Sequence, residues 1–409
     1  MSAKLRLNAA AATFISLAVI LALAGAGVVA SSSASTSRSG ASAARQSAQP
    51  ATPQPKCGDT ITTDVTLHHN LVNCPNNGLI IGADNITLNL NYHTIRGDGR
   101  PAGGCDPQTD FCDTGIVNFG HDGVTVIHGS LRGFDSGANF FGPLRHNRLL
   151  DISSRNRVVG ISLFRASRSL IQDSSGNHVS SGPDAFAGLG VFNSDHVRVL
   201  HNSIRHNATD HGMFMADTND SVIKGNRFSR NGGEGLLIEG SDHNRISRNR
   251  LVRNGAGITL GSGSGSHNVI KQNHVFRGRD GIRIEKGHDN LVADNVVSHA
   301  RRAGIRLGIL HPFLGGAHNT VRGNLVKGSR VDGFLVNAKD NHSVLKRNTA
   351  RGAGDDGFDI QSRTATLTKN RARRNGDLGI AAVRGVIDGG GNEASGNGDA
   401  RQCTYVACG

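Results

Sequence analysis

The sequence predicts an all-β solenoid of about 13 stacked coils, and three observations support this fold class. A glycine followed by apolar, variable and apolar residues recurs through the chain, as in Gly235–Ile238 and Gly281–Ile284. Most of these glycines lie 22 to 24 residues apart, and an Asn-led strand pattern follows each phrase. Strands that repeat at so short a period, with no helical pattern between them, are typical of a solenoid. The leading glycines are Gly78, Gly115, Gly137, Gly160, Gly188, Gly212, Gly235, Gly257, Gly281, Gly304, Gly333, Gly357 and Gly379.

Alternating apolar residues predict short strands with one face in the core. Ile282 and Ile284 flank the polar Arg283, so we expect both isoleucines to point inward. Phe358 and Ile360 should do the same in a later coil. Each period contains three such segments, separated by turn residues. No single segment can bury a face, so the next coil must supply its ladder partner, roughly 4.8 Å along the axis.

Asparagines at fixed places in the repeat predict sharp corners. Asn tolerates the left-handed backbone conformation, and its amide can hydrogen-bond to the equivalent Asn of the next coil. We therefore expect two ladders of stacked asparagines. The first consists of Asn202, Asn226, Asn249, Asn273, Asn295, Asn324, Asn348 and Asn370, and the second of Asn244, Asn268, Asn290 and Asn319.

The start of the chain has the pattern of an export signal. Residues 1–30 contain early positive charges, an uncharged stretch and small residues before a cleavage point, although the stretch is long enough for an uncleaved anchor. Residues 31–56 are rich in Ser, Ala and Pro and predict a flexible linker. Residues 57–409 then form one solenoid domain. We expect a secreted monomer, with attachment to the cell surface left open and no further membrane span.

Six cysteines agree with export, because disulfides persist in oxidising compartments. They fall in three close pairs, and closeness on a rigid solenoid favours pairing within each one, although six cysteines allow fifteen connectivities. None has the spacing of a zinc site. The expected disulfides are Cys57–Cys74, Cys105–Cys112 and Cys403–Cys408.

The formal net charge of +13 predicts an acidic partner, such as an anionic polysaccharide or a cell-envelope polymer. The alternative is that arginine keeps a glycine-rich solenoid soluble. Nucleic acid is disfavoured, because the chain has no Trp, two Tyr and no basic-aromatic pattern for stacking bases.

The repeats resemble the right-handed parallel β-helix superfamily, which includes pectate lyases, polygalacturonases and alginate epimerases. They are most similar to its generic repeat subclass, to which NosD-type periplasmic proteins belong. The opening Cys57–Thr62 with Leu88–Ile95, and the ending Gly396–Gly398 with Cys403, resemble the caps of secreted bacterial members. The resemblance covers residues 57–409 and implies a right-handed parallel β-helix. The Asp-Pro-His-Asp signature of alginate epimerases and the Asn-Thr-Asp signature of polygalacturonases are absent.

Aligning the coils on their glycines places carboxylates and arginines along the first strand, the face where the related enzymes have their clefts. Such a mixture suits acidic sugars, because Arg can bind a uronate carboxylate and paired carboxylates can serve as acid and base. Three aspartates could hold Ca²⁺, which prefers oxygen ligands. The candidate catalytic residues are His211, Asp280, Arg283, Glu285, Arg306, Asp332 and Asp356, and the candidate metal ligands are Asp355, Asp356 and Asp359.

Structural explanations remain open for these residues. Asp before Gly is ordinary turn chemistry, and charged side chains solvate an exposed strand. The histidines that repeat at one corner are more simply structural than metal-binding. Insertions at 97–113, 175–187 and 309–314 are candidate contact loops or tolerated insertions. The repeated histidines are His243, His267, His288, His318 and His342.

These observations favour a secreted β-helix protein that binds acidic polysaccharide, with lyase, epimerase or hydrolase activity left open. The first alternative is a non-enzymatic surface or matrix protein. The scarcity of Trp and Tyr favours it, because sugar subsites often stack on aromatic rings. The second alternative is a NosD-like factor in metal-site maturation, which the structural account of the histidines weakens.

Overall fold

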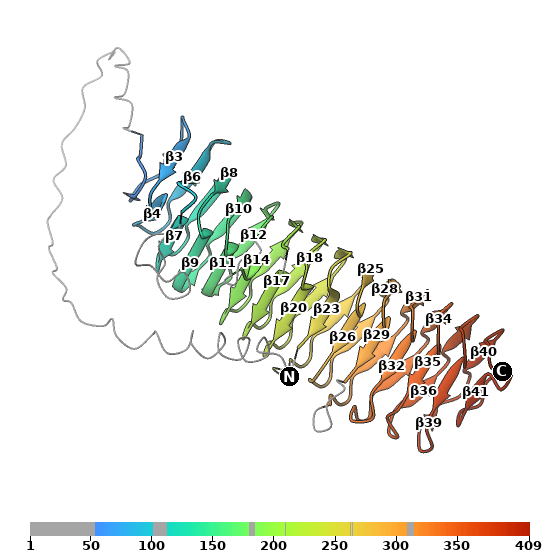
Figure 1. Cartoon of the computed structure of the whole chain (residues 1–409). Helices are drawn as coiled ribbons and strands as arrows, with labels where there is room; N and C mark the ends of the chain where they lie inside the picture. Colours follow the sequence, from blue (N-terminus) through green and yellow to red (C-terminus); the bar gives the residue numbers. More distant parts are fainter. Residues whose placement is uncertain are drawn as a thin grey trace, which may run out of the picture. The chain divides into compact units, whose positions relative to one another are not determined.

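The computed structural model describes residues 54–100, 113–179, 185–208, 210–261, 263, 265–308 and 315–409. Every regular element in this part of the chain is a β-strand, and the strands wind into a right-handed parallel β-helix (Figure 1). Each strand pairs in parallel with its counterpart in the next coil, so the predicted fold class is confirmed. Within the described residues, no helix is long and apolar enough to cross a membrane.

The first sheet carries the leading glycines and has 15 strands. Its strands are β1 (Asp59–Ile61), β4 (Leu79–Ile81), β7 (Thr114–Phe119), β9 (Ser136–Arg145), β11 (Val159–Ser167), β14 (Ala187–Phe192), β17 (His211–Ala216), β20 (Glu234–Glu239), β23 (Ala256–Leu260), β26 (Ile282–Ile284), β29 (Ile305–Leu307), β32 (Phe334–Val336), β35 (Phe358–Ile360), β38 (Ile380–Ala382) and β41 (Cys403–Thr404). The 13 leading glycines account for the strands from β4 to β38, and the two additional strands are the ends of the sheet.

The second sheet follows the first around each coil. Its strands are β2 (Val65–Thr66), β5 (Thr87–Asn89), β8 (Thr125–Arg132), β10 (Arg148–Arg155), β12 (Leu170–Gln172), β15 (Arg198–Leu200), β18 (Val222–Lys224), β21 (Arg245–Ser247), β24 (Val269–Lys271), β27 (Leu291–Ala293), β30 (Thr320–Arg322), β33 (Val344–Lys346), β36 (Thr366–Thr368) and β39 (Ile387–Asp388).

The third sheet closes each coil. Near the N-terminal end, β8 and β10 are long enough to continue from the second sheet into this one, so β10 pairs with both β12 and β13. The other strands of the third sheet are β3 (Leu71–Cys74), β6 (Thr94–Gly97), β13 (Ser175–Gly176), β16 (Ser203–Arg205), β19 (Arg227–Ser229), β22 (Arg250–Val252), β25 (His274–Gly278), β28 (Val296–Ala300), β31 (Leu325–Lys327), β34 (Thr349–Arg351), β37 (Arg371–Arg373) and β40 (Glu393–Ser395).

The core is a continuous column of apolar side chains inside the coils. The four residues predicted to point inward, Ile282, Ile284, Phe358 and Ile360, are all 0% exposed. Stacking continues between coils, since the Phe334 and Phe358 rings lie 4.6 Å apart and nearly parallel. The alternating pattern therefore predicted side-chain direction correctly.

Both predicted asparagine ladders are present. In the first, the Asn249 side-chain Nδ2 and the Asn249 backbone N–H both donate to Asn273 Oδ1, at 3.0 and 2.9 Å. Asn249 Nδ2 also donates to the Ile223 carbonyl at 2.9 Å. The same pattern links Asn244 through Asn319 in the second ladder. A third ladder, which the sequence analysis did not identify, begins with Asn207 and Asn231 before the first sheet.

In four of the five coils, the corner histidine takes the left-handed backbone position. His243, His267, His318 and His342 all have positive φ, between 53° and 58°. The stacked ring pairs are His243 with His267 and His318 with His342.

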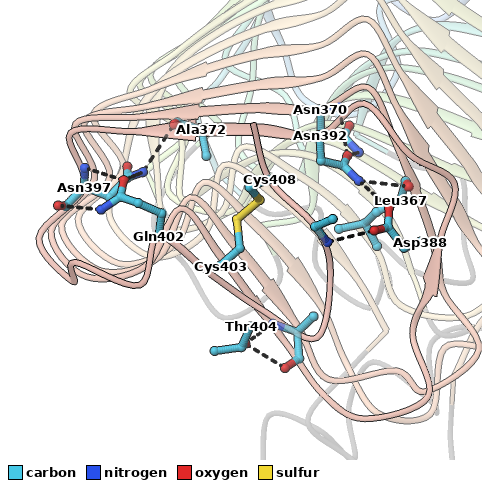
Figure 2. The surroundings of a disulfide bond; sticks show 12 residues. Leu367, Asn370, Ala372, Asp388, Asn392, Asn397, Gln402, Cys403, Thr404 and Cys408 are labelled. Carbon is cyan, nitrogen blue, oxygen red and sulfur yellow. Dashed lines mark hydrogen bonds between the residues drawn. A yellow bond between two sulfur atoms is a disulfide. The ribbon is translucent and has the colours of Figure 1, made fainter.

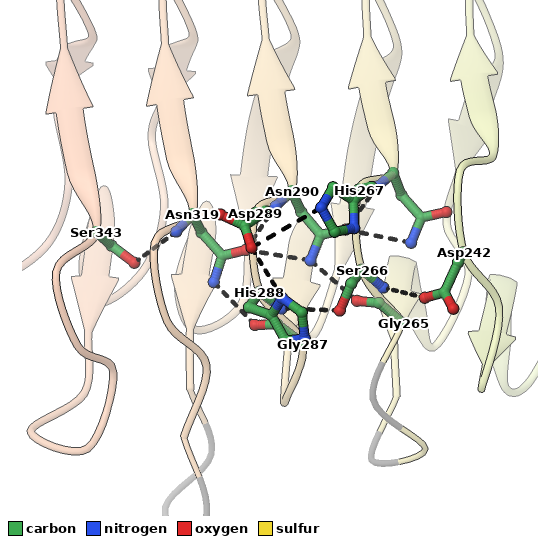
Figure 3. A network of polar contacts seen from close by, with 11 residues as sticks. Asp242, Gly265, Ser266, His267, Gly287, His288, Asp289, Asn290, Asn319 and Ser343 are labelled. Carbon is green, nitrogen blue, oxygen red and sulfur yellow. Dashed lines mark hydrogen bonds and ion pairs between the residues drawn. The ribbon is translucent and has the colours of Figure 1, made fainter.

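The fifth histidine corrects the predicted alignment, because in its coil Asp289 takes the positive-φ position and His288 precedes it. Figure 3 shows the result: Asp289 Oδ2 lies 2.8 Å from His288 Nδ1 and 4.0 Å from His267 Nε2.

Two of the three expected disulfides are confirmed, Cys57–Cys74 and Cys403–Cys408. Cys105 and Cys112 lie outside the described residues, as do residues 1–30, most of the 31–56 linker and the 309–314 insertion. The C-terminal bridge sits where the ladders end (Figure 2). There Asn392 Nδ2 donates to Asp388 Oδ1 and Asn397 Nδ2 donates to Gln402 Oε1, so the last coil supplies acceptors from other residue types.

Candidate functional site on the first sheet

The first sheet presents two outward columns of side chains. They come from the second and the fourth residue after each leading glycine, because the first and third point into the core. The register places Thr259 beside Arg283, Arg283 beside Arg306 and Leu335 beside Asp359. Residues far apart in the sequence thus form continuous rows along the axis.

Aromatic rings fill the fourth-residue column in the N-terminal half. Phe141 pairs in register with Phe119 and Phe164, and Phe164 pairs with Phe192. The Phe141 and Phe164 rings stack at 4.7 Å. Phe214, in the neighbouring column, packs at 5.6 Å on Phe192. Part of this aromatic column is open to solvent. Phe119 is 47% exposed and Phe141 is half-buried, whereas Phe164 and Phe192 are buried.

A histidine and a carboxylate adjoin the aromatic column. His211, which begins β17, lies 5.7 Å from the Phe214 ring, and its Nδ1 lies 2.9 Å from Glu234 Oε2 on the next coil. Nδ1 is also 3.3 Å from the Glu234 backbone nitrogen. We assign the proton to Nδ1, because the shorter contact is a charge-assisted bond to a carboxylate. Nε2 is then free to accept a proton. The two side chains are 17% and 19% exposed.

Arginine side chains neutralise the carboxylates that follow. Arg283 Nη2 contacts Glu234 Oε1 at 3.1 Å, reaching two coils back, and its Nε lies 3.1 Å from Glu285 Oε1, although not aligned for a hydrogen bond. Burial alone would raise the pKa of Glu234, but the hydrogen bond and charge of His211 and the charge of Arg283 lower it to about 2. Glu234 therefore remains ionised in water at any ordinary pH.

The innermost ion pair of this network is Asp280 with Arg306. Asp280 is fully buried, and its Oδ2 lies 3.2 Å from Arg306 Nη2 and 3.8 Å from Arg283 Nη1. Burial lowers the pKa of Arg306, which is 4% exposed. Arg283 already contacts three carboxylates, and Arg306 is buried against Asp280, so neither presents an open fork to a uronate.

The C-terminal coils carry carboxylates without such partners. Burial, followed by repulsion from Asp359, Asp355 and Asp356, raises the pKa of Asp332 to about 7. Burial also raises the pKa of Asp356 to about 6. Potential ligand atoms of Asp355, Asp356 and Asp377 all lie within 4.8 Å of one another. Among the described residues, no Lys, Arg or His forms an ion pair with any of these side chains.

The predicted site residues therefore separate into two groups on one face. His211, Asp280, Arg283, Glu285 and Arg306 belong to one ion network, joined through Glu234. Asp332, Asp355, Asp356 and Asp359 belong to an acidic group farther along, where Asp377 rather than Asp359 completes the closest trio of potential ligands. The sequence analysis did not place Glu234 or Asp377 among the candidate residues.

The aromatic column was also missed, although the sequence contains its signal. A Phe stands four residues after Gly115, Gly137, Gly160 and Gly188, and the same alignment on glycines would have revealed it. The scarcity of Trp and Tyr therefore understates the aromatic content of the first sheet, which comes from Phe.

The three parallel sheets define a right-handed parallel β-helix protein. The family model described as "Periplasmic copper-binding protein (NosD)" matches residues 105–267 and 262–393, more than half of the chain. The chain belongs to this family. No curated protein matches it.

Solved structures share the fold at low sequence identity. A double mutant of the periplasmic alginate epimerase AlgG is 14% identical, with a TM-score of 0.53 over 73% of this chain and 77% of that one. The Dettilon tailspike protein is 15% identical, with a TM-score of 0.48 over 75% and 60%. The A-module of the Azotobacter vinelandii mannuronan C-5 epimerase AlgE6 is 13% identical, with a TM-score of 0.44 over 80% and 79%. At such identities the likeness establishes the fold alone.

The aspartate trio does not fit copper, the metal in the family description. Copper prefers nitrogen and sulfur ligands. The described cysteines are all in disulfides, and Met213 and Met215 are buried in the core. The one group of three or more potential ligands that the described residues bring within 4.8 Å is the aspartate trio, which offers only oxygen. The two disulfides and the family description point to an exported protein, secreted or periplasmic.

Proposed function

We propose that this protein binds an acidic polysaccharide along the outer face of the first sheet and processes it with His211 as the proton-transferring residue. The observation that carries the proposal is the position of His211. Its Nδ1 is held by Glu234, its ring packs on Phe214, and it stands between the aromatic column and the ion network.

The aromatic column answers the strongest sequence argument for a non-enzymatic role, the scarcity of Trp and Tyr. Phe119 and the half-buried Phe141 offer apolar ring surface on which a sugar ring can stack, whereas the other two rings of the column are buried. A polymer along this column would carry successive sugar residues past His211. The fold shared with the alginate epimerase AlgG supports a carbohydrate ligand only as an analogy.

The reaction that best suits His211 is removal of the proton beside a uronate carboxylate, the first step of both elimination and epimerisation. His211 Nε2 would accept this proton, and the ionised Glu234 would stabilise the imidazolium that forms.

Hydrolysis is the second candidate, and the acidic group favours it. Asp332 and Asp356, with pKa values raised to about 7 and about 6, would be partly protonated near neutral pH and could act as general acids. Calcium at Asp355, Asp356 and Asp359 stays a proposal for the same group, and its oxygen-only chemistry suits that ion. A non-enzymatic surface role and a NosD-like role in metal-site maturation stay as alternatives.

The test is a screen of the purified protein against polygalacturonate, alginate and glycosaminoglycans. Elimination would produce unsaturated ends that absorb near 235 nm, and epimerisation would exchange solvent deuterium into the uronate. His211→Ala should abolish either reaction. The matched control is His243→Ala, which removes an exposed corner histidine and should leave the rate unchanged.

Activity that survives in His211→Ala would contradict the role of His211. A release of reducing ends without absorbance near 235 nm, lost in Asp332→Asn, would favour hydrolysis instead.

A further inference from the structure

A carboxylate-free face runs along the third sheet and the corner that follows it. Its eight segments contain 15 Lys and Arg and no Asp or Glu, so their formal charge of +15 exceeds the +13 of the whole chain. We call these segments the basic face. They are residues 203–208, 227–233, 250–255, 274–279, 296–302, 325–331, 349–354 and 371–376.

Coil stacking arranges these cations in rows. Arg227 and Arg250 are register partners at the start of β19 and β22. A second row stands at the corner, where Arg230, Arg253 and Arg277 have φ of 57°, 56° and 57°. All five side chains are exposed. Neighbouring members of a row are separated by one coil, roughly 4.8 Å.

The face is not neutralised by the protein's own carboxylates. Within the described residues, Arg371 and Arg373 form ion pairs with Glu393 at the C-terminal end, and no other cation of the face has an acidic partner. Arg230 instead contacts His206 Nε2 at 3.1 Å. The positive charges in these rows repel one another, and a bound anionic ligand would reduce this repulsion.

A basic hollow adjoins this face. It has a volume of about 190 Å³ and is bordered by four cationic residues and no carboxylate. This is small for a ligand pocket and suits a single charged group. Its lining residues are Lys224, Arg245, Ser247, Arg248, Lys271 and Gln272.

We propose that the basic face is a second binding surface for the acidic polysaccharide, which lies along the solenoid axis with one carboxylate per sugar residue. The distance between neighbouring arginines within a row is close to the length of one sugar residue. Successive carboxylates of the polymer can therefore meet successive arginines, which bind them in fork geometry. This inference rests on the proposed function for the class of polymer. It adds a surface on a different sheet from His211.

Nucleic acid fits this face less well. Single-stranded nucleic acid is held by aromatic side chains that stack on bases, in addition to cations. Of the two Phe in the basic face, Phe228 is fully buried and Phe276 is half-buried beneath Arg277, whose guanidinium lies 5.2 Å from the ring centre. The face therefore offers charge without a stacking platform.

The test is direct binding of polygalacturonate, measured by isothermal titration in low salt. A variant with Arg227→Gln, Arg230→Gln, Arg250→Gln and Arg253→Gln should raise the Kd about tenfold or more, because four contacts are lost together. Binding of the unaltered protein should weaken steeply by 0.5 M salt.

A matched control variant removes the same charge elsewhere. All four of its residues are exposed, form no ion pair among the described residues, and lie outside the basic face, so the Kd should change by less than about twofold. The control substitutions are Arg322→Gln, Lys339→Gln, Arg363→Gln and Arg384→Gln.

Equal weakening in the two variants would overturn the inference, because net charge alone would then explain binding. Tighter binding of polyphosphate or single-stranded DNA than of polygalacturonate at equal salt would overturn it as well. Turnover is a separate readout. A protein that binds polygalacturonate through the four arginines but converts no polysaccharide would overturn the proposed function and support this inference.

Discussion

Glu234 shows how one buried carboxylate links the residues of the candidate site. It holds His211 Nδ1 with one oxygen and Arg283 Nη2 with the other. Removing either partner would leave the largely buried charge of Glu234 without compensation. The resulting loss of stability would exceed the net stabilisation that the ion pair provides. The same contacts fix the imidazole ring in one orientation, as a proton-transferring histidine requires.

The depressed pKa of Glu234 predicts a loss of stability in acid. Because its pKa falls from 4.5 to about 2, the ionised form stabilises the fold above pH 4.5, and this contribution disappears as the pH falls to 2. We expect Glu234→Gln to be less stable than the unaltered protein by about 3 kcal/mol at pH 7. Urea unfolding at pH 7, 4 and 2.5 measures the difference, which should shrink by pH 2.5 to roughly a quarter of its value at pH 7. A difference independent of pH would contradict the assignment.

Asp332 should have the opposite effect. Its pKa is raised from 3.8 to about 7, so the fold favours the protonated form, and stability should decline as the pH rises from about 4 to above 7. Asp332→Asn should remove much of this decline and raise the Tm at pH 8 by a few degrees, an order-of-magnitude expectation. Melting curves in EDTA at pH 5 and 8 test this, and repeating them in Ca²⁺ tests the calcium proposal. A lower Tm in the variant at pH 8 would show that ionised Asp332 is stabilising.

At the scale of the element, the asparagine ladders stabilise corners whose backbone conformation is unfavourable for the residues that adopt it. The residue before each Asn has positive φ and is often His, Arg or Asp rather than Gly, as at His243 and Arg248. For a non-glycine residue, the left-handed backbone conformation costs roughly 1–2 kcal/mol of conformational free energy. The ladder compensates. Each buried Asn side chain, such as Asn249, accepts a backbone N–H and donates to a backbone carbonyl of the preceding coil, and it donates to the Asn side chain of the next coil.

Asn249→Ala tests this balance. It removes the acceptor for Asn226 N–H and Nδ2 and leaves the Ile223 carbonyl without its donor, all in a buried corner. We expect a loss of roughly 3 kcal/mol in the free energy of unfolding, measured in urea, from several unsatisfied buried groups. The neighbouring exposed Arg248→Ala is the control and should change stability by less than about 0.5 kcal/mol. Similar losses in both variants would mean that the ladder is not the source of stability.

At the scale of the whole molecule, a stack of coils must solve the problem of its two ends. A terminal coil presents unpaired backbone groups on one side, which can template aggregation. The two described disulfides lie in these end coils, and the C-terminal one accompanies Gln402 and Asp388, which end two ladders. Within the described residues, each end coil carries a cross-link, and the C-terminal one also supplies side-chain acceptors for two ladders.

Removing the two bridges should have unequal effects. Cys57 and Cys74 are 17 residues apart, and Cys403 and Cys408 are 5 apart, so the loop-entropy model gives about 3 and about 2 kcal/mol. We expect Cys57→Ser with Cys74→Ser to lower the Tm more than Cys403→Ser with Cys408→Ser. Calorimetry measures both, and hydrogen exchange should show fraying confined to the end coil. A larger effect of the C-terminal pair would contradict the entropic account.

The repeat determined most of the fold. Leading glycines, alternating strands and corner asparagines are local patterns, and coil-to-coil pairing repeats each of them, so side-chain direction at Ile282 and the ladder at Asn249 followed from the sequence. The same alignment predicted that His211, Arg283 and Asp332 would share a face, because a residue's place in its coil sets its place on the surface.

Tertiary structure decided which neighbours meet across coils. Arg283 reaches back two coils to Glu234 and is thereby neutralised. Asp332 forms no ion pair with any described arginine, and burial and neighbouring aspartates raise its pKa to about 7. Side-chain length, rotamer and burial determine which charged groups pair, and the spacing of the glycines does not predict any of these three properties. The sequence thus determined where the ionisable groups gather, and the structure determined their protonation and which of them remain available to a ligand.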